Sequence, residues 1–190
     1  MSGPTLPALG LDLATRAGYA VRFSNKSKIR KGLELNLISG VAEMKVVTPS
    51  AATKNKPADH PGLRFNKYRQ FLIELIETHG IKTIFYEEPA GSNKTGGNTL
   101  QVAVGFKVIT LEVASIYDIP CRGFHIATVK KHATGSGKLN SDKQAMIDAA
   151  LDRFPGQEWV AHKPTKRAPW TLDDNQADAL HVLDCGLVAD

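Results

Sequence analysis

Three groups of acidic residues have the types and positions that a metal-dependent reaction needs. They are Asp12, the pair Glu87 and Glu88, and the C-terminal group Asp173, Asp174 and Asp178. Carboxylates that converge on one point repel each other, and a divalent cation relieves that repulsion. Hard oxygen ligands favour Mg²⁺, with Mn²⁺ as a substitute. Two such ions about 4 Å apart activate water and stabilise the leaving oxygen in phosphodiester hydrolysis. The acidic groups therefore predict a two-metal hydrolytic site if the fold brings them together.

The apolar segments next to these residues indicate how they meet. Residues 6–13 are mostly apolar and are typical of a buried strand that carries Asp12 near its end. Residues 83–86 form a second short apolar strand that runs directly into Glu87 and Glu88. We expect these two strands to be neighbours, with their carboxylates side by side at one edge of the sheet.

The last helix is predicted at residues 174–188. Within it, Asp174 and Asp178 are four residues apart, and Asn175 and Asp178 are three apart, so these side chains share one face. Asp178 stands among alanines and leucines on a helix that must pack against the sheet. A carboxylate in that environment needs a partner, and the small neighbours allow a close approach.

A structural explanation competes with the metal site for each acid taken singly. Asp173 is expected to be the N-cap of the last helix, with Gln176 at the third position of a capping box. The other acids are also explained as solvated residues at strand ends. A metal site is favoured because all three acidic groups occur together in one chain.

The remaining pattern defines the fold class. The other predicted strands lie at 19–23, 37–47 and 121–126, and the other predicted helices at 61–79, 100–117, 128–133 and 141–154. Three antiparallel strands followed by alternating helices and strands predict an α/β fold with a mixed five-stranded sheet flanked by helices. The helix at 100–117 is apolar around most of its circumference, so it is expected to be deeply buried or to pair with a partner chain.

Length and charge limit the function classes. The chain has 190 residues, which suits a single domain, 1–190, with a core at about 6–188. Lysine and arginine number 24 against 19 acidic residues, a net charge of +5, which makes a polyanion a plausible partner. The two cysteines have no metal spacing, and no uninterrupted apolar run reaches the roughly 18 residues of a membrane span. We therefore expect a cytoplasmic protein with no membrane partner.

Three segments resemble, in order, the acidic motifs of the RuvC-type Holliday junction resolvases. These are Leu-Gly-Leu-Asp-Leu-Ala at 9–14 with Gly-Tyr-Ala-Val at 18–21, Ile-Phe-Tyr-Glu-Glu-Pro at 84–89, and Asp-Asp-Asn-Gln-Ala-Asp-Ala-Leu at 173–180. The resemblance implies an RNase H-like fold and a phage or bacterial protein that acts in the bacterial cell or the infected host. It also implies a homodimeric, Mg²⁺-dependent endonuclease that cuts four-way junctions and leaves 5′-phosphate and 3′-hydroxyl ends.

The same resemblance assigns metal ligands by position. Asp12 matches the first ligand, Glu87 the second and Asp178 the last, with Glu88 as the alternative to Glu87. The family usually has an Asp or His three residues before the last ligand, where this chain has Asn175. Asparagine can coordinate a metal but cannot act as a base, so the neighbouring Asp174 is a candidate for that role.

A second departure concerns the opening of the junction, and the basic residues supply candidate DNA contacts. Bacterial members carry an aromatic residue three positions after the second acid, where this chain has Ala90. The basic residues expected to contact DNA phosphates are Arg16, Lys94, Lys130, Lys131, Lys138 and Lys143. Lys138 belongs to Gly-Ser-Gly-Lys at 135–138, which lacks the flanking residues of a nucleotide-binding phosphate loop.

These observations give one leading hypothesis and two alternatives. The leading hypothesis is a resolvase-type endonuclease with two Mg²⁺ or Mn²⁺ ions per site. A nearby alternative is a less selective nuclease for flaps and forks, which the missing aromatic residue favours. A third is a non-catalytic DNA-binding module with the same fold, which Asn175 in place of an acid keeps open.

Overall fold

The computed structural model describes residues 3–24, 36–54, 57–90, 97–136, 143–162, 164 and 171–189. Its centre is a five-stranded sheet in the order β3-β2-β1-β4-β5. The strands are β1 (Ala8–Asp12), β2 (Arg16–Arg22), β3 (Leu37–Glu43), β4 (Thr83–Glu87) and β5 (Cys121–Phe124). β1 pairs antiparallel with β2 and parallel with β4, and β4 pairs parallel with β5. This confirms the mixed sheet and the predicted neighbourhood of the first and fourth strands.

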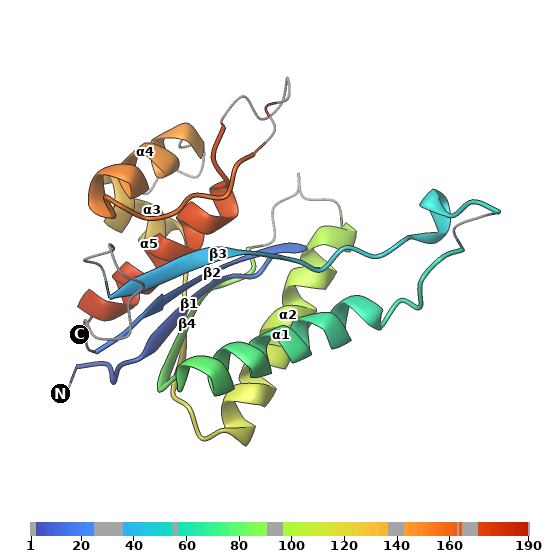
Figure 1. Cartoon of the computed structure of the whole chain (residues 1–190), viewed down its shortest axis with the longest axis horizontal. Helices are drawn as coiled ribbons and strands as arrows, with labels where there is room; N and C mark the ends of the chain where they lie inside the picture. The colour runs from blue at the N-terminus through green and yellow to red at the C-terminus, as the bar shows by residue number, and fades with distance from the viewer. Residues whose placement is uncertain are drawn as a thin grey trace.

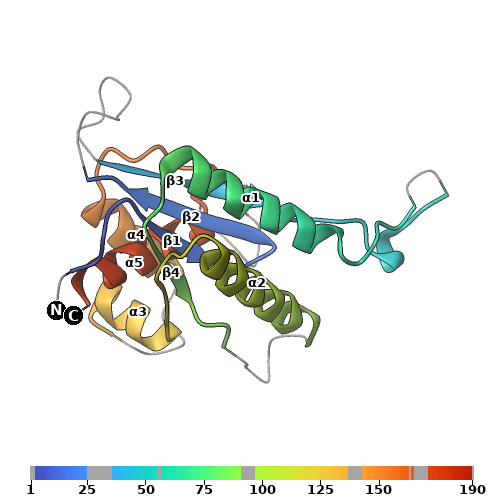
Figure 2. The same ribbon diagram turned by 90° about the horizontal axis from the view of Figure 1, so that it is seen from below.

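Helices cover both faces of the sheet (Figures 1 and 2). They are α1 (Leu63–His79) and α2 (Gly97–Ile116) on one face, and α3 (Ile126–Thr134), α4 (Lys143–Arg153) and α5 (Asp174–Val188) on the other. Each face has its own apolar core, and the strands contribute alternate residues to the two. Leu9 and Leu11 of β1 pack under α1 and α2, whereas Ala8 packs under α5. Asp12 is therefore directed to the α5 side.

α5 lies unusually close to the strands because two glycines face it. A Cβ atom on Gly10 of β1 would lie 2.6 Å from the carbonyl oxygen of Ala179, and one on Gly18 of β2 would lie 1.8 Å from that of Asn175. Any side chain at these positions would meet helix backbone. The two glycines therefore set the separation between the sheet and the acidic helix.

The third strand ends earlier than predicted. The alternating pattern suggested a strand to residue 47, but β3 ends at Glu43, which pairs with Arg16, the first residue of β2. Beyond that point a single backbone hydrogen bond follows, from the nitrogen of Met44 to the carbonyl of Thr15 at 2.7 Å. Residues 44–54 and 57–62 instead form an arm that extends from the body of the protein, with a 3-10 turn at Pro49–Ala51 (Figure 1). Its base is fixed by Asp59, which exchanges backbone and side-chain hydrogen bonds with Val47.

Several other predicted bounds shift by a few residues. β2 begins at Arg16 rather than Tyr19, because the turn after Asp12 is short and Gly18 pairs directly with Asp12. α3 begins at Ile126 rather than Thr128, because His125 caps it by accepting a hydrogen bond from the backbone nitrogen of Ala127 at 3.2 Å. The predicted helix start at Ser141 lies outside the described residues. Both cysteines are free thiols.

Candidate active site

The fold gathers Asp12, Glu87 and Asp178 on one side of the sheet. Leu11 of β1 pairs with Tyr86 of β4, and each of these residues is followed by a carboxylate. α5 crosses the same face above Gly10, which brings Asp178 toward the strand ends. All three acids are half-buried, so they are close to the surface yet surrounded by protein. We call these residues the carboxylate cluster.

The electrostatics of the carboxylate cluster show that its negative charges are close together. Burial, then Asp178 and Glu87, raise the pKa of Asp12 well above its usual value. Burial and Asp178 raise the pKa of Glu87 to about 8, although two lysines oppose the shift. Burial raises the pKa of Asp178 to about 6. Clustered, partly desolvated carboxylates with raised pKa values require compensating positive charge.

Two lysines of the α3–α4 layer provide part of that charge. Lys143, the first residue of α4, forms an ion pair with Asp174 of α5. Lys130 of α3 and Lys143 each lower the pKa values of Glu87 and Asp178. Both residues were predicted to contact DNA phosphates, and both lie beside the carboxylates. Lys131 is exposed on α3.

The donor set of the carboxylate cluster fits a divalent metal ion in chemical type. Three carboxylates offer the hard oxygens that Mg²⁺ and Mn²⁺ prefer, and their raised pKa values report the repulsion that a cation relieves. In the described part of the chain, no three His, Cys, Asp or Glu side chains already surround a common point at ligand distance.

The charge state of the cluster gives a pH prediction. The pKa of Glu87 is raised from 4.5 to about 8 in the folded state. Between these two pH values the folded protein therefore keeps a proton on Glu87 that the unfolded chain has released. The stability from this group is complete below about pH 4.5 and is lost as the pH rises to about 8. In EDTA we expect the melting temperature to be several degrees lower at about pH 8.5 than at about pH 6.

Mg²⁺ binds the deprotonated carboxylates and should recover most of this loss. The measurement is a thermal melt at both pH values, in EDTA and in Mg²⁺. Glu87→Gln should make the EDTA melts less dependent on pH. A wild-type melt that is equally stable at both pH values in EDTA contradicts the assignment.

Asp173 caps α5, as predicted, but the prediction of a capping box with Gln176 is wrong. The Asp173 carboxylate accepts hydrogen bonds from the backbone and side-chain nitrogens of Asn175 at 3.0 and 2.9 Å. Gln176 does not reach back to Asp173. Its side chain accepts from the backbone nitrogen of Val160 and donates to the carbonyl of Glu158. A segment remote in sequence thus takes the bonds that the local pattern assigned to the cap.

Asn175 and Asp174, the two candidates for the additional site residue, have different partners in the structure. Asn175 uses its amide nitrogen to support the Asp173 cap, whereas Asp174 is bonded to Lys143, the lysine that acts on the carboxylate cluster. The structure therefore favours Asp174 over Asn175 as the additional acidic residue of the site.

Glu88 lies away from the carboxylate cluster. Successive strand residues point to opposite faces, so Glu88 follows Tyr86 toward α2. Its carboxylate accepts hydrogen bonds from Lys107 at 2.6 Å and from the Tyr86 hydroxyl at 3.1 Å. The geometry therefore places Glu87, and not the alternative Glu88, in the carboxylate cluster.

Arg16 has a role that the sequence did not indicate. Its guanidinium pairs with Asp173 at 2.6 Å and with Glu43 at 2.8 Å, so it joins the turn after Asp12 to the start of α5. It is engaged by carboxylates within the protein rather than left for DNA. No local signal links residues so distant in the chain. Of the other predicted DNA contacts, Lys94 and Lys138 lie outside the described residues.

This bridge predicts that Arg16→Gln misplaces the acidic helix. Asp173 is fully buried, and loss of Arg16 leaves its charge uncompensated. If the carboxylate cluster cleaves DNA with Mg²⁺, as the resemblance to the resolvases implies, we expect about a tenfold to hundredfold lower cleavage rate and a higher Mg²⁺ requirement, with DNA affinity nearly unchanged. Arg16→Lys should recover part of the rate because it retains one ion pair. Glu43→Gln, which removes only the exposed ion pairs of Glu43 with Arg16 and Lys45, serves as the control. Equal effects of Arg16→Gln and Glu43→Gln would refute the positioning role.

Comparisons with known proteins identify the fold. No family model matches the chain, and neither does any curated protein sequence. Among solved structures, Thermus thermophilus RuvC in complex with a Holliday junction substrate matches with a TM-score of 0.58 and 15% identity, over 94% of this chain and 90% of that one. A second Thermus thermophilus RuvC structure matches with a TM-score of 0.55 and 16% identity, over 94% and 91%. The yeast mitochondrial Holliday junction resolvase Ydc2 matches with a TM-score of 0.59 and 16% identity, over 98% and 80%.

These matches cover 94% to 98% of this chain. They agree with the motifs at 9–14, 84–89 and 173–180. The chain therefore has the RNase H-like fold of the RuvC-type Holliday junction resolvases.

Proposed function

We propose that this protein is a metal-dependent endonuclease that cuts branched DNA, with the four-way junction as its main substrate. The observation that carries the proposal is the carboxylate cluster at the strand ends, on the fold shared with RuvC and Ydc2. A structural role does not account for three repelling carboxylates beside two lysines. A metal site that acts on a phosphodiester does.

The proposed ligands are Asp12, Glu87 and Asp178, with Asp174 available after release from Lys143. When bound, two Mg²⁺ or Mn²⁺ ions lower the pKa of the attacking water and stabilise charge on the leaving oxygen. The carboxylates must be deprotonated to serve as ligands, and the lysines favour that state. Lys130 and Lys143 also offer cationic contacts to the phosphate at the cut. Departure of the 3′ oxygen leaves 5′-phosphate and 3′-hydroxyl ends.

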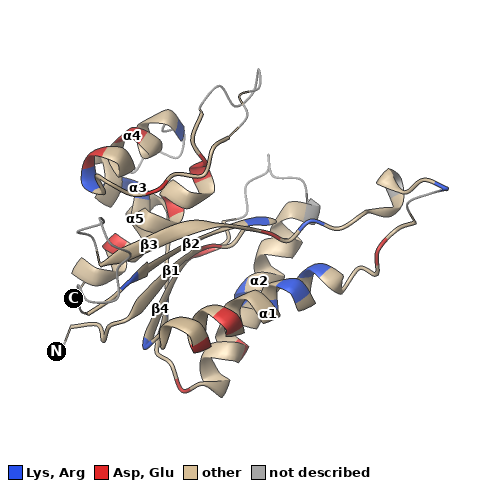
Figure 3. Cartoon of the chain, viewed as in Figure 1, with Lys and Arg blue, Asp and Glu red and all other residues tan. Residues whose placement is uncertain are grey.

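The charge distribution supports a DNA substrate. The net charge of +5 includes acids that are gathered at the cluster, so the rest of the surface is more basic than that number suggests. Figure 3 shows lysine and arginine residues, coloured blue, on the arm and at the start of α1. Contacts of this kind release counterions, and binding should weaken steeply with salt.

A homodimer is part of the proposal, and α2 offers its interface. The helix buries Phe106, Ile109 and Val113, yet Val104, Val108 and Leu111 are 44%, 58% and 41% exposed. Residues 99–116 are long and apolar enough to cross a membrane by length and composition. Lys107 and Glu112 of this helix are ion-paired with Glu88 and Arg69 of the same fold, which favours a protein partner over lipid. A second copy would cover the apolar face and place two active sites on one junction.

The test uses a labelled four-way junction with Mg²⁺, and flaps and forks of the same sequence. The expected result is paired, symmetric nicks in the junction whose products can be resealed by DNA ligase. Equal cutting of flaps and forks would favour the less selective nuclease. That alternative rests on Ala90, which is exposed at the end of β4 and has no ring to open the junction. Binding without cleavage in either Mg²⁺ or Mn²⁺ would rule out both enzymes and leave the DNA-binding module.

A further inference from the structure

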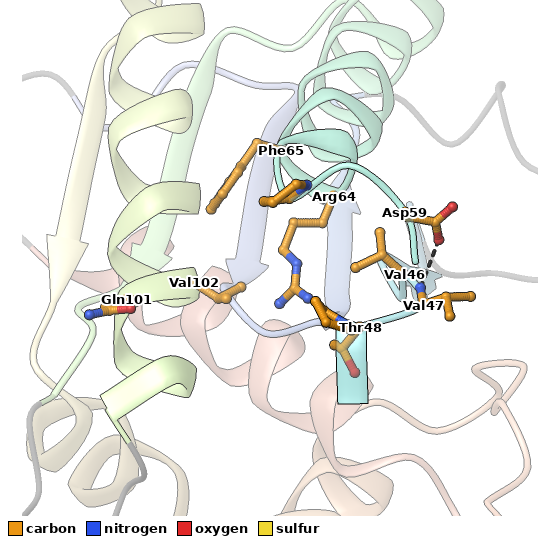
Figure 4. A pocket seen from close by; sticks show the side chains of 10 residues that line it. Val46, Val47, Thr48, Asp59, Arg64, Phe65, Gln101 and Val102 are labelled. Atoms are coloured by element: carbon orange, nitrogen blue, oxygen red, sulfur yellow. Dashed lines mark hydrogen bonds between the residues drawn. The ribbon is translucent and has the colours of Figure 1, made fainter. Parts of the chain in front are cut away.

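A pocket lies at the base of the arm, on the face of the sheet opposite the carboxylate cluster. We call it the arm pocket. Its volume is about 360 Å³, and it is bounded by the arm, the start of α1 and the first turns of α2 (Figure 4). The residues that line it include Val46, Thr48, Asp59, Arg64, Phe65 and Val102. A volume of this size is in the range of small-ligand sites.

Arg64 gives the arm pocket a positive charge. The residue is half-buried, and its side chain extends between Thr48 and Val102 (Figure 4). Within the described ranges, no acidic side chain lies at ion-pair distance from its guanidinium. Asp59, the acid of the pocket wall, is committed to the backbone nitrogen of Val47 at 2.7 Å. A partly desolvated guanidinium without a counter-charge favours an anionic ligand.

The walls of the arm pocket are apolar and fixed. The Phe65 ring packs edge-on against Phe106 with centroids 5.8 Å apart. It also lies over Gly105, where a Cβ atom would come within 2.3 Å of the ring. Val46 and Val102 complete the apolar wall. The pocket therefore combines one planar cation with rigid apolar surface, which suits a ligand with a phosphate and a flat ring.

The position of the arm pocket connects it with the active site. β3 ends at Glu43, whose ion pair with Arg16 lies at the carboxyl edge of β1, and the arm begins at the next residue. α2 starts from the same edge, after β4. Residues 44–70 contain six lysines and arginines and one acid, Asp59. A DNA strand that leaves the carboxylate cluster over this edge would meet the arm pocket on a basic surface.

We propose that the arm pocket binds one unpaired nucleotide of branched DNA, next to the strand that is cut. Its phosphate pairs with the Arg64 guanidinium, and its base lies against Phe65 and Val102. The occupant is thus DNA, not a second copy of the protein. Stabilising an unpaired nucleotide supplies a way to hold a junction open when position 90 has no aromatic ring. The inference rests on the proposed function.

The test measures DNA binding in EDTA, so that cleavage does not enter. A four-way junction carries the fluorescent base 2-aminopurine at one position flanking the branch point, and each flanking position is examined in turn. Wild-type protein should change the emission at one position. Arg64→Gln should weaken binding about tenfold, as expected for the loss of a charge-assisted contact. Val102→Phe, which fills the pocket, should abolish the emission change.

Lys82→Gln is the control, because it removes one charge from an exposed residue. Lys82 directly precedes β4, at the amino end of that strand, whereas the carboxylate cluster lies at the carboxyl end. It should change affinity less than about twofold. Thermal melts establish that each variant folds. If Val102→Phe keeps the emission change, the base does not enter the pocket and the proposal fails. It also fails if Arg64→Gln binds as tightly as Lys82→Gln, or if the variants alter only dimer formation in sedimentation. If wild type cleaves junctions in Mg²⁺ in such a case, the proposed function still stands.

Discussion

Asp12→Asn is expected to abolish cleavage while leaving junction binding intact. Asp12 is the central carboxylate of the cluster, and its pKa is raised by burial and by both other members. Asparagine keeps the shape but removes the charge that holds a cation. Bound metal ions supply several kcal/mol of transition-state stabilisation, which corresponds to a rate loss on the order of 10³-fold or more. Asp178→Asn should behave in the same way.

The stability of these variants distinguishes loss of chemistry from loss of fold. Because the three carboxylates repel one another, removing one charge should raise the melting temperature in EDTA and reduce the stabilisation by Mg²⁺. The measurements are single-turnover cleavage, binding of junction DNA in EDTA, and thermal melts with and without Mg²⁺. An inactive variant that is also less stable than wild type would not support the assignment.

Glu88→Gln is the matched control for both substitutions. It removes a carboxylate one residue from Glu87, but on the opposite face, where it is paired with Lys107. We expect cleavage within a few-fold of wild type. If Glu88→Gln abolishes cleavage while Glu87→Gln does not, the two glutamates have exchanged roles and the register of β4 must be revised.

The sequence predicted the parts of this site that depend on local pattern. The buried strands at 6–13 and 83–86, the helix at 174–188 and the Asp173 cap follow from hydrophobic periodicity and side-chain type. Neighbouring parallel strands then place Asp12 beside the end of β4. The mixed sheet and the neighbourhood of its first and fourth strands were also predicted, because a meander followed by alternating helices and strands leaves few arrangements.

Contacts between remote segments could not be predicted in this way. The choice between Glu87 and Glu88 depends on which face each occupies, and a shift of one residue reverses it. The partners of Gln176 come from residues 158–160 and from Ser39 of β3. The partners of Arg16 are Glu43 of β3 and Asp173, the N-cap of α5. The early end of β3 depends on where β2 begins. Each of these is a property of pairing across the fold, for which the local sequence carries no signal.

Gly18→Ala is expected to disable the site by displacing a helix. A Cβ atom at this position would lie 1.8 Å from the carbonyl oxygen and 2.5 Å from the carbonyl carbon of Asn175. These are backbone atoms at the start of α5, so no side-chain rotation relieves the overlap. The N-terminal end of the helix must move away from β2, and it carries Asp174 and Asp178. Misplacement of catalytic groups by about 1 Å can cost about 10²-fold in rate.

We expect Gly18→Ala to fold, with a loss of about 1–3 kcal/mol from overpacking, and to cleave about 10²-fold more slowly. Its Mg²⁺ requirement should rise, because the carboxylates must close over a longer distance to share an ion. Gly40→Ala is the control, since a Cβ atom there would approach only the Tyr19 ring, at 2.9 Å from its hydroxyl oxygen, and a ring can shift. Junction binding in EDTA should be similar for both variants. If Gly18→Ala retains the wild-type rate and Mg²⁺ dependence, the close contact between β2 and α5 does not control the geometry of the carboxylate cluster.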